Sequence, residues 1–300
     1  MGAMGVLLLI GIVLTLRWGG EPYRPWEPAG ADHDGGPEPP GAAVRRYLRD
    51  VAVVVVAGVW AGALVTGPAL RLSMRLLAVT SGDEAQRRLT EANEVVGSID
   101  LGGTIGLILF GGILPGLVSG ALYLVVRRLL PRGRLAGVAF GLLHLVLVAT
   151  RLDPLRPGNP DFDLLGPGWL SVLTFGATVV LHGMAVVAIA NRYSATVAAP
   201  PSPGARRWIA VLPLVSAAAI LAPGAPVLVP VVGAGLLVVV ATSRSTTLVD
   251  VVRSGRLVPI GRALLLAAIV VSLPGTLVGL HDVVVGDDEA AGADATSPPP

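Results

Sequence analysis

The sequence predicts an all-α integral membrane protein, a helical bundle of about eight transmembrane helices with one short external amphipathic helix. Apolar residues make up 53% of the 300-residue chain and charged residues only 14%, and the mean hydropathy is +0.74. Soluble domains have about 45–50% apolar and roughly 25% charged residues. The apolar residues also gather in runs of about 20, the length that crosses a hydrocarbon core of about 30 Å.

Eight runs qualify as spans: residues 3–17, 51–70, 101–126, 135–150, 169–190, 208–222, 226–242 and 261–280. The first is short, and no A-x-A-like cleavage site follows it, which favours an uncleaved anchor or a mis-assigned start over a secretory signal. "APGAP" breaks the run 208–242 into a hairpin or a re-entrant pair. We divide the chain into an anchor and linker (1–43), a transmembrane domain (44–282) and a disordered acidic tail (283–300).

The charges between the runs predict an orientation in the cell membrane. Residues 127–134 hold four arginines and no acid, whereas residues 151–168 hold more acids than bases. Basic loops stay on the cytoplasmic side. Alternation then places residues 44–50 inside, the segment 71–100 outside, and both termini outside.

The charged segment "SGDEAQRRLTEANEVVGSID" (81–100) lies between two uncharged runs. Ser81 and Glu84 have the spacing of a capping box, and Gly97 is a natural helix stop. The pairs Asp83–Arg87 and Glu84–Arg88 have the spacing of stabilising ion pairs in a helix. These features predict a short external helix over residues 82–96, lying against the bundle or the headgroups.

Arg71 and Arg75 lie one helical turn apart at the predicted outer boundary of the second span. Three interpretations remain open for them: contact with lipid headgroups, ion pairs with Glu91 or Glu94, and an anion site.

The stretch "RLTEANEVVGSIDLGGTIGLILFGG", with the preceding "MRLLAVTSGD", resembles a family of multi-pass membrane proteins from high-GC bacteria. The resemblance covers roughly residues 45–130. It implies a multi-pass membrane protein, and it implies no activity and no functional residues.

Small residues recur every fourth position in two successive spans. They are Gly58, Gly62 and Thr66 in one and Gly112, Gly116 and Gly120 in the other. This spacing lets two helix backbones approach closely in lipid. It predicts that the two spans pack on each other, with a face for a homo-oligomer or another membrane protein as the alternative. Pro68 and Pro115 predict local kinks.

His144 and His182 are the ionisable residues that the predicted spans place well inside the membrane. Each lies about 12–13 Å from the inner end of its helix, from the rise per residue. We therefore expect both imidazoles to point into the bundle, within about 10 Å of each other. Two separately hydrogen-bonded histidines, a proton or solute relay, and metal or haem ligation are the interpretations.

Two function classes follow. The leading one is a non-enzymatic scaffold, accessory or envelope component. The alternative is a small-solute or ion transporter with a polar path near His144 and His182. No phosphate loop, H-E-x-x-H or G-x-S-x-G motif occurs, so an enzyme is not favoured. No metal, cofactor or nucleic acid is expected, and the partner is the lipid bilayer.

Overall fold

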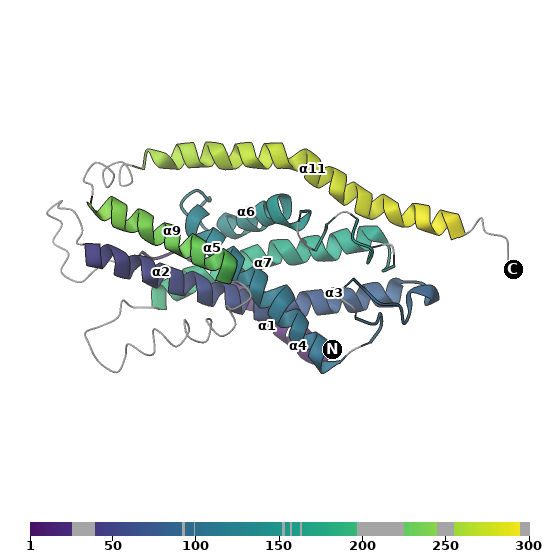
Figure 1. Ribbon diagram of the computed structural model, residues 1–300. Coiled ribbons are helices and arrows are strands. Elements are labelled where there is room, and N and C mark those ends of the chain that lie inside the picture. The colour runs from purple at the N-terminus through teal and green to yellow at the C-terminus, as the bar shows by residue number, and fades with distance from the viewer. Residues whose placement is uncertain are drawn as a thin grey trace.

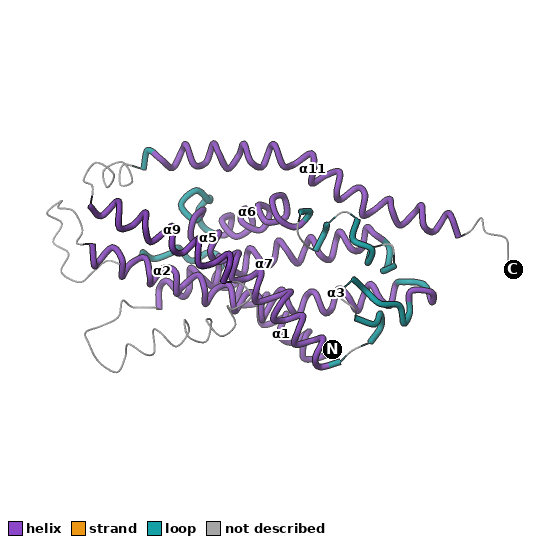
Figure 2. Tube along the Cα trace, viewed as in Figure 1, coloured by secondary structure: helices purple, strands orange, loops and turns teal. Residues whose placement is uncertain are grey.

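The computed structural model describes residues 1–25, 40–91, 94–98, 100–151, 154–156, 158–162, 164–196, 225–244 and 255–294. Over these residues the chain is a bundle of helices without a named strand (Figure 1, Figure 2). The elements are α1 (Gly2–Trp18), α2 (Pro40–Ala61), η1 (Gly62–Thr66), α3 (Gly67–Thr80), η2 (Asp83–Ala85), α4 (Leu101–Gly106), η3 (Leu107–Ile113), α5 (Leu114–Val126), α6 (Arg134–His144), η4 (Leu145–Ala149), α7 (Gly168–Thr196), α9 (Ala225–Arg244) and α11 (Leu257–Asp294).

Four of the described helices are long and apolar enough to cross a membrane, so the expectation of eight spans is too high. They are Gly41–Thr80, Leu101–Val126, Gly168–Thr196 and Leu257–Val285. Two expected spans correspond to the shorter apolar helices Gly2–Trp18 and Arg134–Ala149, which fall below the roughly 20 residues that a crossing needs. The expected span 226–242 coincides with α9, which is not one of the four, and 208–222 lies outside the described residues.

The core of the bundle is built on α2, α5, α6 and α7, with α1 packed against α7 and α3. The two rows of small residues lie face to face. A Cβ at Gly112 would lie 2.6 Å from the carbonyl oxygen of Gly62, and one at Gly58 would overlap the backbone of Gly116. Close backbone approach of this kind stabilises helix pairs in lipid through dispersion contacts.

Three π-helical turns interrupt the helices in the described part of the chain. η1 ends immediately before Gly67 and Pro68, and η3 ends two residues before Pro115. A proline cannot donate to the carbonyl four residues earlier, and its ring crowds that carbonyl. A wider turn before it relieves both problems. The third turn, η4, follows directly after His144.

The charged segment is not the helix that its local pattern predicts. Among its described residues, which leave out 92, 93 and 99, only Asp83–Ala85 is helical, as one 3₁₀ turn. An antiparallel bridge then joins Leu89 to Val95, and Arg87 adopts a positive φ of 68°. The local ion pairs of a helix here are worth only about 0.2–0.5 kcal/mol each. Contacts with the loop before α7 outweigh them, since Asp161 accepts a hydrogen bond from the Glu91 backbone at 2.7 Å.

We call residues 81–98 the cap. They lie at the end of the bundle where α3 finishes, together with the loop that precedes α7 (Figure 2). The opposite end, which we call the basic end, brings together the arginine-bearing segments around residues 44–50, 127–134 and 191–196. Arg49 donates there to the carbonyl of Ser194, and Arg127 pairs with Asp50.

α11 runs along the outside of the bundle, at the top of Figure 1. Its Arg262 donates to Leu129 at the basic end, and Thr276 donates to Val146 further along. Most of its apolar side chains are exposed. The helix continues to Asp294, so it extends into the segment that the sequence assigns to a disordered tail.

Candidate functional site

Four polar side chains form a continuous hydrogen-bonded chain in the middle of the bundle. Thr66 Oγ1 lies 2.6 Å from His182 Nδ1, and His182 Nε2 lies 2.9 Å from Ser119 Oγ. Ser119 Oγ also lies 2.9 Å from His144 Nε2, and His144 Nδ1 lies 3.0 Å from the Phe140 carbonyl oxygen. Every one of these side chains is buried, with 8% exposure or less. The chain thus joins η1, α7, α5 and α6.

The carbonyl at one end fixes the direction of the whole chain. A carbonyl oxygen only accepts, so Nδ1 of His144 carries the proton, and its Nε2, when neutral, accepts from Ser119. Ser119 has a single hydroxyl proton, so Nε2–H of His182 must donate to it. Nδ1 of His182 then accepts from Thr66. The two neutral histidines are therefore opposite tautomers.

Glycines place the two histidines close together. Gly183 follows His182 directly, and Gly141 lies three residues before His144. A Cβ at Gly183 would overlap the backbone of Gly141. The backbones of α6 and α7 therefore touch at this height. The ring centroids of His144 and His182 are 6.1 Å apart, inside the range expected from the sequence.

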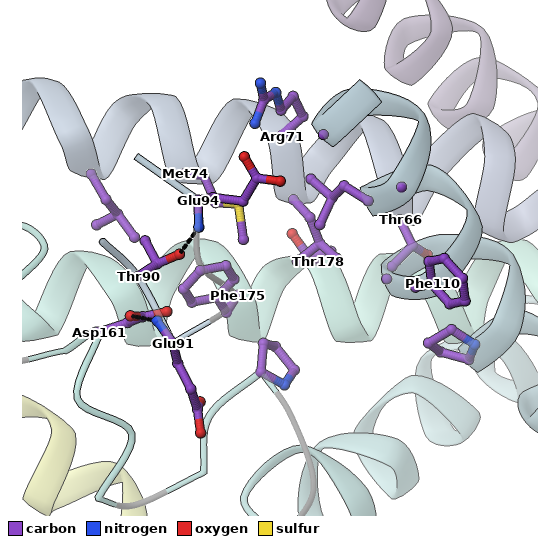
Figure 3. A pocket seen from close by; sticks show the side chains of 18 of the residues that line it. Thr66, Arg71, Met74, Thr90, Glu91, Glu94, Phe110, Asp161, Phe175 and Thr178 are labelled. Atoms are coloured by element: carbon purple, nitrogen blue, oxygen red, sulfur yellow. Dashed lines mark hydrogen bonds between the residues drawn. The ribbon is translucent and has the colours of Figure 1, made fainter. Parts of the chain in front are cut away.

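A cavity of about 820 Å³ connects this chain to the cap. Thr66, Ser119 and both histidines line its inner end, and Thr90, Glu94 and other cap residues line its outer end. Figure 3 shows Thr178, Phe175 and Phe110 at its walls. The three π-helical turns all contribute to the lining, and such turns are frequent at functional sites.

Arg71 lies on the wall of this cavity. Its exposed fraction is 8%, and neither Nε nor Nη2 has a hydrogen-bond partner among the described residues. α3 continues to Thr80, so Arg71 lies within the helix. It points inward instead of snorkelling to the surface. Arg75, one turn later, is exposed and donates to the Gly97 carbonyl at 3.3 Å.

The expected ion pairs between these arginines and the cap do not form. Glu91 pairs with Arg156 at 2.7 Å. In the described part of the chain, no ion pair joins Arg71 or Arg75 to Glu91 or Glu94. The reason is the fold of the cap, which turns Glu91 toward the loop before α7. Figure 3 shows the Glu94 carboxylate in the cavity on the side that faces Arg71.

The basic end is closed by a buried polar network that the sequence reasoning missed. Asp50 accepts from Tyr23 at 2.6 Å and from Arg127 at 2.5 Å, and Asn191 accepts from Tyr123 at 3.0 Å. Burial raises the pKa of Tyr23 above its usual value. One feature of the sequence could have indicated this network. Asp50 is the acid that ends the basic stretch "VRRYLRD".

Metal ligation finds no support in the described residues, where no group of three or more His, Asp or Glu side chains could hold an ion. Comparison with protein-family models, curated proteins and solved structures gave no match. The resemblance to a family from high-GC bacteria therefore stays an expectation from the sequence.

Proposed function

We propose that this protein is a membrane transport protein that admits a small solute through the cavity at the cap. One observation carries the proposal: the cavity leads from the cap to both histidines of the buried chain. Ionisable side chains at membrane depth commonly mark solute or proton pathways, and these face an open volume, not packed core.

The two ends of the bundle differ, which supports a transport cycle. The cavity is lined by cap residues at one end. At the other, Asp50, Tyr23 and Arg127 fill the space between helices with paired groups. A carrier exposes its site to one side at a time. The arrangement fits a state open at the cap and closed at the basic end.

The hydrogen-bonded chain supplies a means of coupling to protons. Each neutral imidazole has one nitrogen that accepts a hydrogen bond, from Thr66 or from Ser119, and this nitrogen can take up a proton. Ser119 bridges the two rings, so the state of one ring affects the other. The scaffold interpretation assigns no role to this chain or to the cavity.

Cysteine accessibility tests whether the cavity is open. The chain has no cysteine, so an introduced one is unique. Thr178→Cys lies on the cavity wall, whereas Ala185→Cys lies two turns along α7 in closed core. A membrane-impermeant thiol reagent should modify Thr178→Cys from the cap side and leave Ala185→Cys unmodified. Equal inertness of both would contradict an open cavity.

Proton movement tests the function. In vesicles containing a pH-sensitive dye, the wild-type protein should dissipate an imposed pH gradient faster than protein-free vesicles. The variant His182→Gln should lose this effect, and His281→Gln, at an exposed position of α11, should keep it. If the wild type matches protein-free vesicles, transport is refuted and the scaffold interpretation stands.

A further inference from the structure

We infer that the cavity binds an amphiphilic monoanion, with its single carboxylate or phosphodiester group at Arg71 and its apolar body along the cavity wall. The inference rests on the proposed function, since it names the substrate class of the same cavity.

Arg71 provides the first argument. A buried guanidinium whose Nε and Nη2 lack partners is unfavourable, because its lost hydration is not replaced. These two atoms lie on one side of the planar group, and a carboxylate or phosphate can accept from both at once. An anion at this position supplies the missing acceptors.

The walls provide the second argument. Beyond Arg71 the cavity is lined mainly by apolar side chains, among them Leu107, Phe110, Val118 and Phe175. Its volume of about 820 Å³ lies in the range of about 300–1,000 Å³ typical of sites for organic ligands. An inorganic anion alone would leave most of this apolar surface uncovered, so the ligand has an apolar body.

The charges around Arg71 limit the ligand to one negative charge. Glu94 faces the guanidinium across the cavity (Figure 3), and Asp161 also lines the site. Glu91 is neutralised by Arg156, and Arg75 is exposed at the rim. A second negative charge on the ligand would be repelled by Glu94.

The cavity reaches both the cap and partly exposed apolar side chains. Cap residues line it, and Phe110 and Val118, which also line it, are 60% and 38% exposed. The experiment therefore distinguishes two sources of the anion, solution and the bilayer. Both sources share one chemistry, an anionic group on an apolar chain.

Binding of decanoate to the full-length protein in phosphatidylcholine nanodiscs tests the inference. Isothermal titration should show saturable binding of decanoate, and at least tenfold weaker binding of decanol, which lacks the charge. Arg71→Gln should weaken decanoate binding at least tenfold, whereas Arg192→Gln, the same change at the partly exposed Arg192 of the basic end, should alter it less than twofold. Glu94→Gln should tighten binding, because it removes the charge opposite Arg71.

Thermal unfolding separates a ligand site from a structural arginine. Without ligand, Arg71→Gln should unfold at the same or a higher temperature than wild type, because an unpartnered buried charge is gone, and decanoate should no longer raise that temperature. A lower temperature in Arg71→Gln, or undiminished decanoate binding, would overturn the inference.

The source is decided by adding phosphatidylglycerol to the nanodiscs. Competition with decanoate identifies a lipid as an occupant, and unchanged affinity identifies a free solute. If Thr178→Cys reacts but decanoate does not bind, the ligand class is wrong and the proposed function survives. If decanoate does not bind and Thr178→Cys does not react with the thiol reagent, the ligand class and the proposed function are both wrong.

Discussion

The imidazole rings of His144 and His182 lie with their centroids 6.1 Å apart at an interplanar angle of 72°. They do not bond to each other directly. Ser119 lies between them and contacts Nε2 of each ring at 2.9 Å. Because a hydroxyl has one proton, it cannot donate to both rings, and this asymmetry determines how the site behaves.

The first prediction concerns the tautomers. His144 should carry its proton on Nδ1, held by the Phe140 carbonyl, and His182 on Nε2. The chain has four histidines, so ¹⁵N-histidine spectra of the wild type and of single His→Gln variants can assign each ring. The nitrogen shifts of these two rings should show opposite tautomers at neutral pH. Identical tautomers would refute the assigned direction of the chain.

The second prediction concerns Ser119 itself. Ser119→Ala leaves one acceptor on His144 and one donor on His182 unsatisfied, and each such loss costs about 1–3 kcal/mol. The free energy of unfolding, measured by detergent titration, should fall accordingly. Ser171→Ala is the matched control, since that hydroxyl is buried and has no hydrogen-bond partner in the part of the chain that the structure describes. Ser171→Ala should leave the free energy of unfolding unchanged or raise it. A similar decrease in both variants would show that the hydrogen bonds of Ser119 make no specific contribution to stability.

Much of this arrangement could be read from the sequence, for a physical reason. Counting residues along the two successive helices predicted that His144 and His182 lie at the same height, and their ring centroids are 6.1 Å apart. Rows of glycine at spacing four report on close contact in the same way. Ser119 was missed because a lone serine in an apolar helix has no distinguishing pattern.

The cap shows where local reasoning fails. Its capping box and ion-pair spacings all favour a helix, yet Gln86 donates to the Ala78 carbonyl and Arg156 pairs with Glu91. These partners are 8 and 65 residues away in the chain, and no pattern within residues 81–100 contains that information. The unpartnered state of Arg71 depends on the same folding and was equally hidden.

A third prediction tests the glycine rows. Gly58→Ala places a methyl group against the backbone of Gly116, so α2 and α5 must separate. Overpacking of this kind costs about 1–3 kcal/mol. Gly275→Ala in α11, where nothing lies within 4 Å of the new atom, should instead gain about 0.5–1 kcal/mol from reduced backbone entropy. The two changes in unfolding free energy should have opposite signs, and equal signs would argue against direct contact.

The fourth prediction concerns pH at the cap. Burial, with the charge of Glu91 adding to it, holds the pKa of Asp161 above the ordinary aspartate value of 3.8. The native state then binds more protons than the unfolded state just above that value, so this group's contribution to stability falls as pH rises through the folded pKa. Asp161→Asn keeps an oxygen for the Glu91 amide and removes the charge. The variant should be more stable than wild type at neutral pH and equal to it below pH 3.8 in thermal unfolding scans. A constant difference at every pH would exclude ionisation as the cause.

The last prediction concerns the basic end. Asp50 accepts from Tyr23 and pairs with Arg127, whose guanidinium also lies 4.2 Å from the centre of the Tyr23 ring. Asp50→Asn removes the carboxylate that pairs with the buried Arg127. Breaking a buried ion pair lowers the free energy of unfolding by about 3–5 kcal/mol. Glu21→Gln is the control, because its contact with Arg192 is longer at 3.7 Å and partly exposed, where such pairs contribute about 1 kcal/mol or less. The free energy of unfolding should therefore fall severalfold more in Asp50→Asn than in Glu21→Gln.

If the basic end is a closure that opens during transport, Asp50→Asn should also speed the loss of a pH gradient in vesicles, at temperatures where the variant remains folded. A slower loss would mean that Asp50 belongs to the proton path and does not close it.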